Sequence, residues 1–353
     1  MVELLSTKRV QSFRAIQEDE VARLVQAVSS AASTSLVNVS KFLSTYNNDV
    51  IVRCVVGDHR LIDRNTLISY ITKAIEYAQA PTIADLFPSW RLACALTHKF
   101  GKMDLFIDRL FEFMDTIISD NKTQMDEAHQ EDITSVLLRI HREGNHQFTL
   151  TMGTIKAVVF DLLLSGTHTV TTIIDWAMAE LMRNPLVMSR AQSEVRTAFM
   201  EEMKVTEEGL RKLRYFHWVI KETLRLHTPG PLLIGRGSQE TCRVMGYDVP
   251  KGSMVLPETF KPERFENDTR DFRGHDFEFT PFGAGRRMCP GVSFGLASVE
   301  LALANLLFHF DWNLPDGVDA NKLDMAETMG FVGKRKAELW LKPILRVPFA
   351  SRN

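Results

Sequence analysis

The chain has 353 residues, 45% of them hydrophobic, so it is long enough to bury the core of one large domain or of two ordinary ones. Its net charge is −2, and neither sign forms a long block, which argues against a nucleic-acid-binding surface. The four cysteines lie far apart and form no C-x-x-C pair, which favours reduced thiols over a disulfide framework or a structural zinc site.

Neither the start of the chain nor its most apolar run indicates a membrane segment. The first twenty residues are charged, unlike a secretory signal peptide. The most apolar run, "AVVFDLLLSG" at 157–166, is short and contains Asp161, so it suits a buried helix better than a membrane span. The sequence as written therefore predicts no transmembrane anchor.

Most of the chain has a helical pattern. Helices are expected over 10–57 with a break near "SAAST", then over 98–122, 151–184, 186–203, 207–227 and 290–310, and "ADLFPSW" at 84–90 marks a helix stop. Strand-like pieces occur at 243–256 and 336–344. With no internal repeat, this order predicts one mainly α domain over 1–353 with small β patches.

The stretch "FTPFGAGRRMCPGVSFG", 279–295, surrounds one cysteine with glycines and arginines ahead of an apolar helix. It reads F-x-x-G-x-R-x-C-x-G, with fixed positions Phe282, Gly285, Arg287, Cys289 and Gly291. Five fixed positions recur by chance in roughly one in ten thousand chains of this length. A lone cysteine is otherwise a buried core thiol, and the frame favours a functional one.

Each position in this frame has a use if the cysteine is the axial thiolate ligand of a haem iron. Gly285 and Gly291 let the backbone turn tightly beside a flat macrocycle. Pro290 suits the first turn of the next helix, which places the sulfur at a helix N-terminus that favours the thiolate. Arg287 can pair with a haem propionate, and Phe282 can keep water from the sulfur.

This frame resembles the haem-binding signature of the cytochrome P450 superfamily, the haem-thiolate monooxygenases. "PFGAGRRMCPG", 281–291, is similar to the plant group that oxidises specialised metabolites. The resemblance implies haem b with its iron on Cys289, dioxygen, and a small apolar substrate. It also implies an NADPH-dependent cytochrome reductase docking on the cysteine side near Arg286, and a place on the cytosolic face of the endoplasmic reticulum membrane.

"KETLRLH" contains Glu222-x-x-Arg225, which resembles the E-x-x-R pair of this family, and "FKPERF" supplies Arg264 as the third member of its charge cluster. The resemblance implies that the cluster fixes the cysteine loop by specifying one geometry. An ordinary surface pair is the alternative, because E-x-x-R also starts at four other positions: Glu20, Glu180, Glu208 and Glu240.

"SGTHT" in the long helix breaks helix propensity with glycine and β-branched residues. It resembles the family's oxygen-binding turn, in which Gly166 opens the groove and Thr169 bonds the bound oxygen and helps to deliver protons. His168 stands where the family has an acid. The unperturbed pKa of a histidine lies near neutrality, which suits a proton shuttle, but a protonated histidine carries the opposite charge to an ionised acid. The alternative is a threonine that bonds back within its helix.

Other segments match the family by position. "TPGPLLIGR" resembles the segment lining the pocket beside the haem, with Leu232 and Leu233 facing substrate and Arg236 reaching a propionate. "AETMGFVGKRKAEL" resembles the last substrate-contact turn, with Met329 and Phe331 at its tip. Ordinary core packing is the alternative for all five.

The family pattern is also incomplete in this sequence. The match begins partway along the pattern, after its N-terminal anchor, hinge, first sheet strands and recognition loop. A second gap falls between Leu256 and Pro257, where the family has a strand and a short helix. Without the anchor the chain would be cytoplasmic. Two alternatives to the monooxygenase stay open: a haem-thiolate isomerase or dehydratase, and a catalytically inactive truncated remnant or splice product acting through protein contacts.

Overall fold

The computed structural model describes residues 2–32, 36–57, 63–79, 99–124, 131–144, 150–230, 242–244, 247–249, 260–276, 278–328, 330 and 332–349. These residues are mainly helical, as the sequence predicts. The chain divides into two compact units, one made of Met1–Glu20 and Thr45–His168 and the other of Val21–Ser44 and Thr169–Asn353. The single domain over 1–353 stays a prediction.

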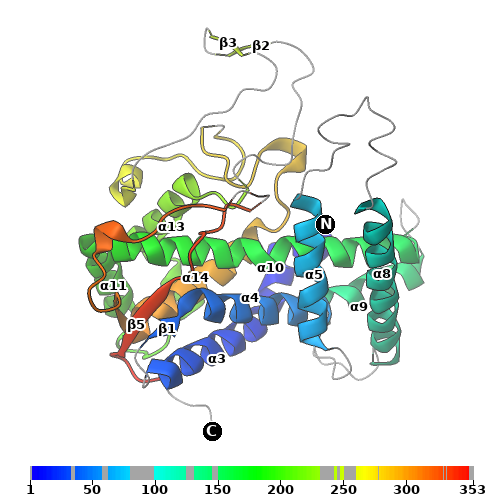
Figure 1. The fold of residues 1–353 in the computed structure, drawn as a ribbon, viewed down its shortest axis with the longest axis horizontal. Helices are drawn as coiled ribbons and strands as arrows, with labels where there is room; N and C mark the ends of the chain where they lie inside the picture. The colour runs from blue at the N-terminus through cyan, green and yellow to red at the C-terminus, as the bar shows by residue number, and fades with distance from the viewer. Residues whose placement is uncertain are drawn as a thin grey trace. The chain divides into compact units, whose positions relative to one another are not determined.

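The described residues of the first unit form helices and the short connections between them. It contains α1 (Val2–Leu5), α2 (Thr7–Ser12), α5 (Arg64–Gln79), α8 (Lys99–Gln124) and α9 (Ile133–Glu143). It also takes the start of α3 (Arg14–Ala32), the end of α4 (Val39–Val55) and the first half of α10 (Met152–Arg183), the long green helix in Figure 1. Its core is mostly aliphatic, with buried side chains at Leu67, Ile71, Ile117 and Ile133, and it also contains the ring of Phe13.

The second unit packs α11 (Pro185–Phe199), α12 (Glu207–Leu210), α13 (Arg214–Leu226) and α14 (Val292–His309) around an aromatic core. Its small antiparallel sheet has the order β1 (Val37–Asn38), β5 (Trp340–Leu345), β4 (Phe310–Asn313), and β1 lies beside β5 in Figure 1. The strands β2 (Cys242–Val244) and β3 (Tyr247–Val249) pair as a hairpin. The largest fully buried side chains are Trp176, Phe199, Phe216, Phe308 and Phe310.

One predicted helix is wrong. The pattern over 207–227 forms two helices, α12 and α13, separated at Arg211–Leu213. The carboxylate of Glu194, on α11, accepts the backbone N–H groups of Arg214, Tyr215 and Phe216 at 3.0, 3.0 and 2.8 Å. Those N–H groups lack intrahelical partners at a helix start, so a tertiary contact fixes where α13 begins.

The helices α5 and α9 are absent from the sequence prediction. For α9 the signals were available, because the side chain of Asp132 caps its start by accepting the N–H of Ser135 at 2.8 Å. Gly144 ends it in the left-handed region at φ 63°, donating to the carbonyl of Ile140.

Two helices of the described chain, α10 and α14, are long and apolar enough to cross a membrane by length and composition. In α14, 67% of the most apolar window is buried inside the protein, and in α10 the share is 39%. Core helices of folded domains have the same composition, and the burial of α14 is typical of one.

Candidate active site

The loop ahead of α14 holds the cysteine frame in a defined backbone shape. The N–H of Cys289 donates to the carbonyl of Phe282 at 2.8 Å, and the N–H of Met288 donates to that of Gly285 at 3.1 Å, closing the turn η2 (Gly285–Arg287). Gly283 and Gly285 have φ of 72° and 70°, in the left-handed region that favours glycine. Of the two glycines predicted to bend this loop, Gly285 therefore adopts a backbone conformation that favours glycine.

The thiol of Cys289 lies beside the start of α14. The backbone N–H of Gly291 donates to its sulfur, and a Cβ placed on Gly291 would lie 3.8 Å from that sulfur. Burial raises the pKa of the Cys289 thiol by desolvation, and the Gly291 N–H opposes this shift. The residue as a whole is exposed. An N–H donor on an accessible sulfur suits a thiolate ligand.

The expected position of Pro290 is wrong by two residues. The helix α14 begins at Val292 with Gly291 as its N-cap, so Pro290 precedes the cap and does not occupy the first turn. The carbonyl of Gly291 accepts the N–H of Gly295 at 2.8 Å. The sulfur nevertheless stays near the helix N-terminus, because Cys289 is two residues before the cap.

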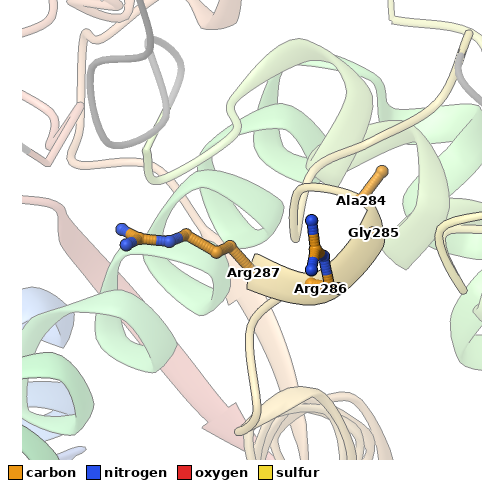
Figure 2. Close-up of a pocket in the computed structure, with 4 residues that line it drawn as sticks. All are labelled: Ala284, Gly285, Arg286 and Arg287. Carbon is orange, nitrogen blue, oxygen red and sulfur yellow. The ribbon is translucent and has the colours of Figure 1, made fainter.

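A cavity of about 580 Å³ is lined by Ala284, Gly285, Arg286 and Arg287. Figure 2 shows the two arginines leaving the η2 turn in different directions. The volume of the cavity lies within the range of pockets for small molecules and cofactors, about 300–1,000 Å³. Two arginines at one cavity match a ligand that carries acidic substituents.

The donor set around Cys289 fits a haem better than a bare metal ion. Among the described residues, no group of three or more His, Cys, Asp or Glu side chains could hold a metal ion. A haem brings four nitrogen ligands of its own and needs one axial protein ligand. A single cysteine therefore suffices for haem, and it would not suffice for a structural zinc site.

A row of phenylalanines connects the cysteine loop to the turn η1 (Pro262–Phe265). Phe282 lies 5.5 Å from Phe272, Phe272 lies 6.2 Å from Phe279, and Phe279 lies 5.4 Å from Phe265, all between ring centroids. Phe265 and Phe279 are buried. Such tilted and edge contacts favour specific relative positions of the rings, so η1 and the loop are packed as one block.

The predicted charge cluster is assembled in the structure. The fully buried carboxylate of Glu222 lies 2.7 Å from Arg225 Nε, and both of its oxygens lie 3.2 Å from Arg264 Nε. The backbone N–H of Lys261 also donates to Glu222, at 2.7 Å. Charged groups with this many partners at a buried site restrict the geometry, so α13 is bound to η1, which carries Phe265.

Comparison with known proteins decides the family. The sequence profile of the cytochrome P450 family matches residues 1–340. The chain belongs to the cytochrome P450 family. This P450 is an enzyme of the monooxygenase class that the sequence predicts, and its mainly α fold is the one expected.

Several plant proteins resemble this P450 over nearly its whole length. Desmethyl-deoxy-podophyllotoxin synthase of Sinopodophyllum hexandrum is 40% identical over 97% of the chain and 71% of its own length. Dolabradiene monooxygenase of Zea mays is 41% identical over 100% and 73%. Tabersonine 3-oxygenase of Catharanthus roseus is 40% identical over 96% and 71%. The chain thus spans somewhat under three quarters of the length of these relatives.

The "SGTHT" segment of the P450 lies inside α10, which runs without interruption over Met152–Arg183. A Cβ on Gly166 would lie 2.5 Å from Cδ1 of Ile51, on α4, so the missing side chain allows close packing of two helices. The expected groove for oxygen at Gly166 stays a prediction. His168 and Thr169 are half-buried.

Two contacts place this segment against its neighbours. The side-chain amide of Asn47 donates to the carbonyls of Gly166 and Thr167 at 2.8 and 2.7 Å, a contact that the sequence did not indicate. Val170, next to Thr169, has a methyl group 3.8 Å from where a Cβ on Gly295 would lie. The helix that carries Thr169 therefore runs beside the first turn of the helix that follows Cys289.

Some predicted site residues lie outside the described residues of this P450. They are the proposed pocket and propionate residues Leu232, Leu233 and Arg236, and the turn-tip residues Met329 and Phe331. The predicted gap at Leu256–Pro257 and the helix stop at 84–90 lie outside them as well.

Proposed function

We propose that this P450 binds haem b through Cys289 and inserts one atom of dioxygen into a small apolar substrate. The observation that carries the proposal is the cysteine loop. Its thiol is accessible, its sulfur receives the N–H of Gly291, and its backbone is held by the bond from Cys289 to Phe282 at 2.8 Å. A thiolate-ligated haem supplies the activation of dioxygen and the cleavage of the O–O bond.

The residues of the loop have separate roles in this proposal. Cys289 ligates the iron, and the Gly291 N–H stabilises negative charge on its sulfur. Arg287 and Arg236 pair with the propionates, which bear the negative charge that guanidinium groups bind well. Gly285 gives the loop its left-handed turn beside the macrocycle, and Phe282 excludes water from the sulfur.

The turn of α10 that contains Gly166, His168 and Thr169 is proposed to supply protons. The Thr169 hydroxyl holds a proton donor toward the reacting oxygen, and His168 relays protons in place of the family's acid. The contact of Val170 with the Gly295 position supports this, because it puts the threonine's helix beside the helix that starts after the thiolate.

The substrate is proposed to be small and apolar, bound by Leu232, Leu233, Met329 and Phe331. The names of the relatives support this class: one is a dolabradiene monooxygenase and another a tabersonine 3-oxygenase. Electrons come from an NADPH-dependent reductase that docks on the cysteine side, where Arg286 is exposed. We place the enzyme at the endoplasmic reticulum membrane, facing the cytosol.

The experiment is a reduced, carbon-monoxide-bound absorbance spectrum of the full chain. The thiolate-type Soret band is expected in the native protein and is expected to vanish in Cys289→Ala. Cys54→Ala is the matched control, because Cys54 is fully buried in the core and its removal leaves the band in place. A folded chain without any haem band would instead favour the inactive remnant.

A further inference from the structure

The turn η1 is attached to α13 at a second place, two helical turns before Glu222. The hydroxyl of Tyr215, in the first turn of α13, donates to the carboxylate of Glu263 in η1 at 2.8 Å. Positions 215 and 222 are seven residues apart, so they lie on one face of the helix, about 10 Å apart along its axis. Both side chains contact η1 from that face.

The helix α11 fixes the tyrosine from the other side. The guanidinium carbon of Arg190 lies 4.1 Å from the centroid of the Tyr215 ring, and its Nη1 atom lies 3.4 Å from the same Glu263 oxygen that accepts the hydroxyl. The carboxylate of Glu194 accepts the Tyr215 N–H at 3.0 Å. The backbone and the ring of Tyr215 are therefore both held, with the hydroxyl directed at Glu263.

Burial decides which of these contacts is the strongest. Tyr215 is 4% exposed, whereas the Arg190 side chain is 54% exposed, and an exposed ion pair contributes little. Desolvation and the hydrogen bond to Glu263 raise the pKa of Tyr215, so the hydroxyl keeps its proton and remains a donor. A buried donor bonded to a charged acceptor makes the stronger contact.

Two attachments constrain η1 in a way that one does not. The bonds to Glu222 all end on one carboxylate, about which the turn could pivot, and the contact at Glu263 prevents that rotation. The orientation of η1 matters for the loop, because Phe265 begins the row of rings that ends at Phe282. The carbonyl of Phe282 in turn accepts the N–H of Cys289 at 2.8 Å.

We propose that Tyr215 and Glu263 are positioning residues for the cysteine loop. Their hydrogen bond sets the orientation of η1, and η1 sets the position of Cys289 through the phenylalanine row. The inference rests on the proposed function only in taking Cys289 as the ligand of the haem iron. Its role is distinct from that of Glu222, because the tyrosine is neutral and its loss leaves no buried charge without a partner.

The principal variant is Tyr215→Phe, which removes the hydroxyl and keeps the ring against which Arg190 lies. The Glu263 side chain is 34% exposed, so water replaces the lost donor and the chain is expected to fold. Tyr70→Phe is the matched control, because it removes the same hydroxyl from a half-buried ring of α5, in the first unit. Glu263→Ala removes the acceptor instead, and the double variant completes a double-mutant cycle.

The first measurement is amide hydrogen exchange in the full chain. Exchange of the Cys289 N–H is expected to be about tenfold faster in Tyr215→Phe than in the native chain, the effect of losing one hydrogen bond to a charged group. The Phe310 N–H donates to Leu306 at the other end of α14 and is the reference within the same unit. Its exchange should stay unchanged, and Tyr70→Phe should change neither amide.

The second measurement is the rate at which the haem-loaded chain loses the thiolate-type Soret band of its reduced carbon-monoxide complex in mild urea. Tyr215→Phe should speed this loss about tenfold, and Glu263→Ala at least as much. The double variant should be no faster than Glu263→Ala, because the hydroxyl has no acceptor once the carboxylate is gone. Should Glu263→Ala fail to fold, Tyr215→Phe carries the test.

Unchanged exchange at Cys289 in Tyr215→Phe overturns the proposal. Equal acceleration at Cys289 and Phe310 overturns it too, because the hydroxyl would then support the whole unit and not the loop. Faster exchange at Cys289 without faster loss of the band, or additive effects in the double variant, also contradicts it. A native chain without a haem-thiolate spectrum refutes the proposed function, and the exchange measurement then still decides whether Tyr215 holds the loop.

Discussion

Arg264 Nε lies 3.2 Å from both carboxylate oxygens of Glu222, although 42 residues separate the two in the sequence. The carboxylate is fully buried and also accepts the N–H of Lys261 at 2.7 Å. The hydrogen bond from Lys261 comes from its backbone N–H, so Glu222 fixes the backbone at the start of the η1 turn as well as the side chain of Arg264 within it. From η1, the phenylalanine row continues to Phe282 in the cysteine loop.

We expect Glu222→Gln to destabilise the chain by about 3 kcal/mol or more, because it leaves two guanidinium groups without their buried anion. The haem band of the surviving folded protein should also fall, since η1 would no longer hold the loop. Urea unfolding and the carbon-monoxide spectrum measure the two effects. Glu208→Gln is the control: Glu208 begins another E-x-x-R and is exposed, and no change is expected there. Equal effects of both variants would contradict the role of the cluster.

Gly166→Ala should destabilise the first unit by about 1–3 kcal/mol, because its Cβ would overlap Ile51 Cδ1 and Cγ1 at 2.5 and 2.6 Å. Ile51→Ala removes both atoms and leaves the Ile51 Cβ at an ordinary 3.6 Å. The double variant should therefore be more stable than the two single losses predict, by about 1 kcal/mol in a double-mutant cycle. Additive losses in urea unfolding would show that this contact is not the reason for the glycine.

The pairing of His217 with Glu300 predicts a pH dependence of stability. Burial opposes the charged form of His217, but the carboxylate of Glu300 outweighs it and raises the pKa, aided by the Leu213 carbonyl and by Glu194. A raised pKa stabilises the folded state below the unfolded value of about 6.5, and this stabilisation is lost as pH rises through the folded pKa.

His217→Gln should accordingly be less stable than the native chain at pH 5.5, by at most about 1 kcal/mol for a half-exposed pair. The difference should shrink toward zero by pH 8.5, where the native histidine is neutral. Thermal unfolding of both proteins across this pH range is the measurement. A constant difference at every pH would mean that packing, and not charge, explains the loss.

His168→Asp tests the proton relay. An acid at this position restores the family pattern, so we expect more product per NADPH consumed and less hydrogen peroxide, measured with a fluorogenic alkoxycoumarin probe and a reductase. Thr169→Val, which removes the hydroxyl, should do the opposite. If His168→Asp leaves the ratio unchanged while the haem band is intact, His168 has no part in proton delivery.

Local patterns were sufficient for some of this protein. Residues 279–291 could be interpreted from the sequence because the thiolate frame is continuous, and the backbone bond from Cys289 to Phe282 spans only seven residues. The long helix over 151–184 was predicted to within one residue at each end of α10, because its apolar periodicity outweighs the glycine and β-branched residues inside it.

Other features depended on contacts between distant residues. The split between α12 and α13 depends on Glu194 of α11, and the partner of Glu222 could be named only from the family resemblance. Asn47 carried no signal in the sequence, since an asparagine within a helix is ordinary until its amide meets the carbonyls of Gly166 and Thr167.

The sequence by itself determined the frame around Cys289 and the extent of the long helix α10, because both follow from neighbours along the chain. Only the tertiary structure decided which side chains meet at Glu222 and Glu263, and why Gly166 must stay small. Those contacts depend on helix packing, where positions far apart in sequence come within a few ångströms and no local periodicity records it.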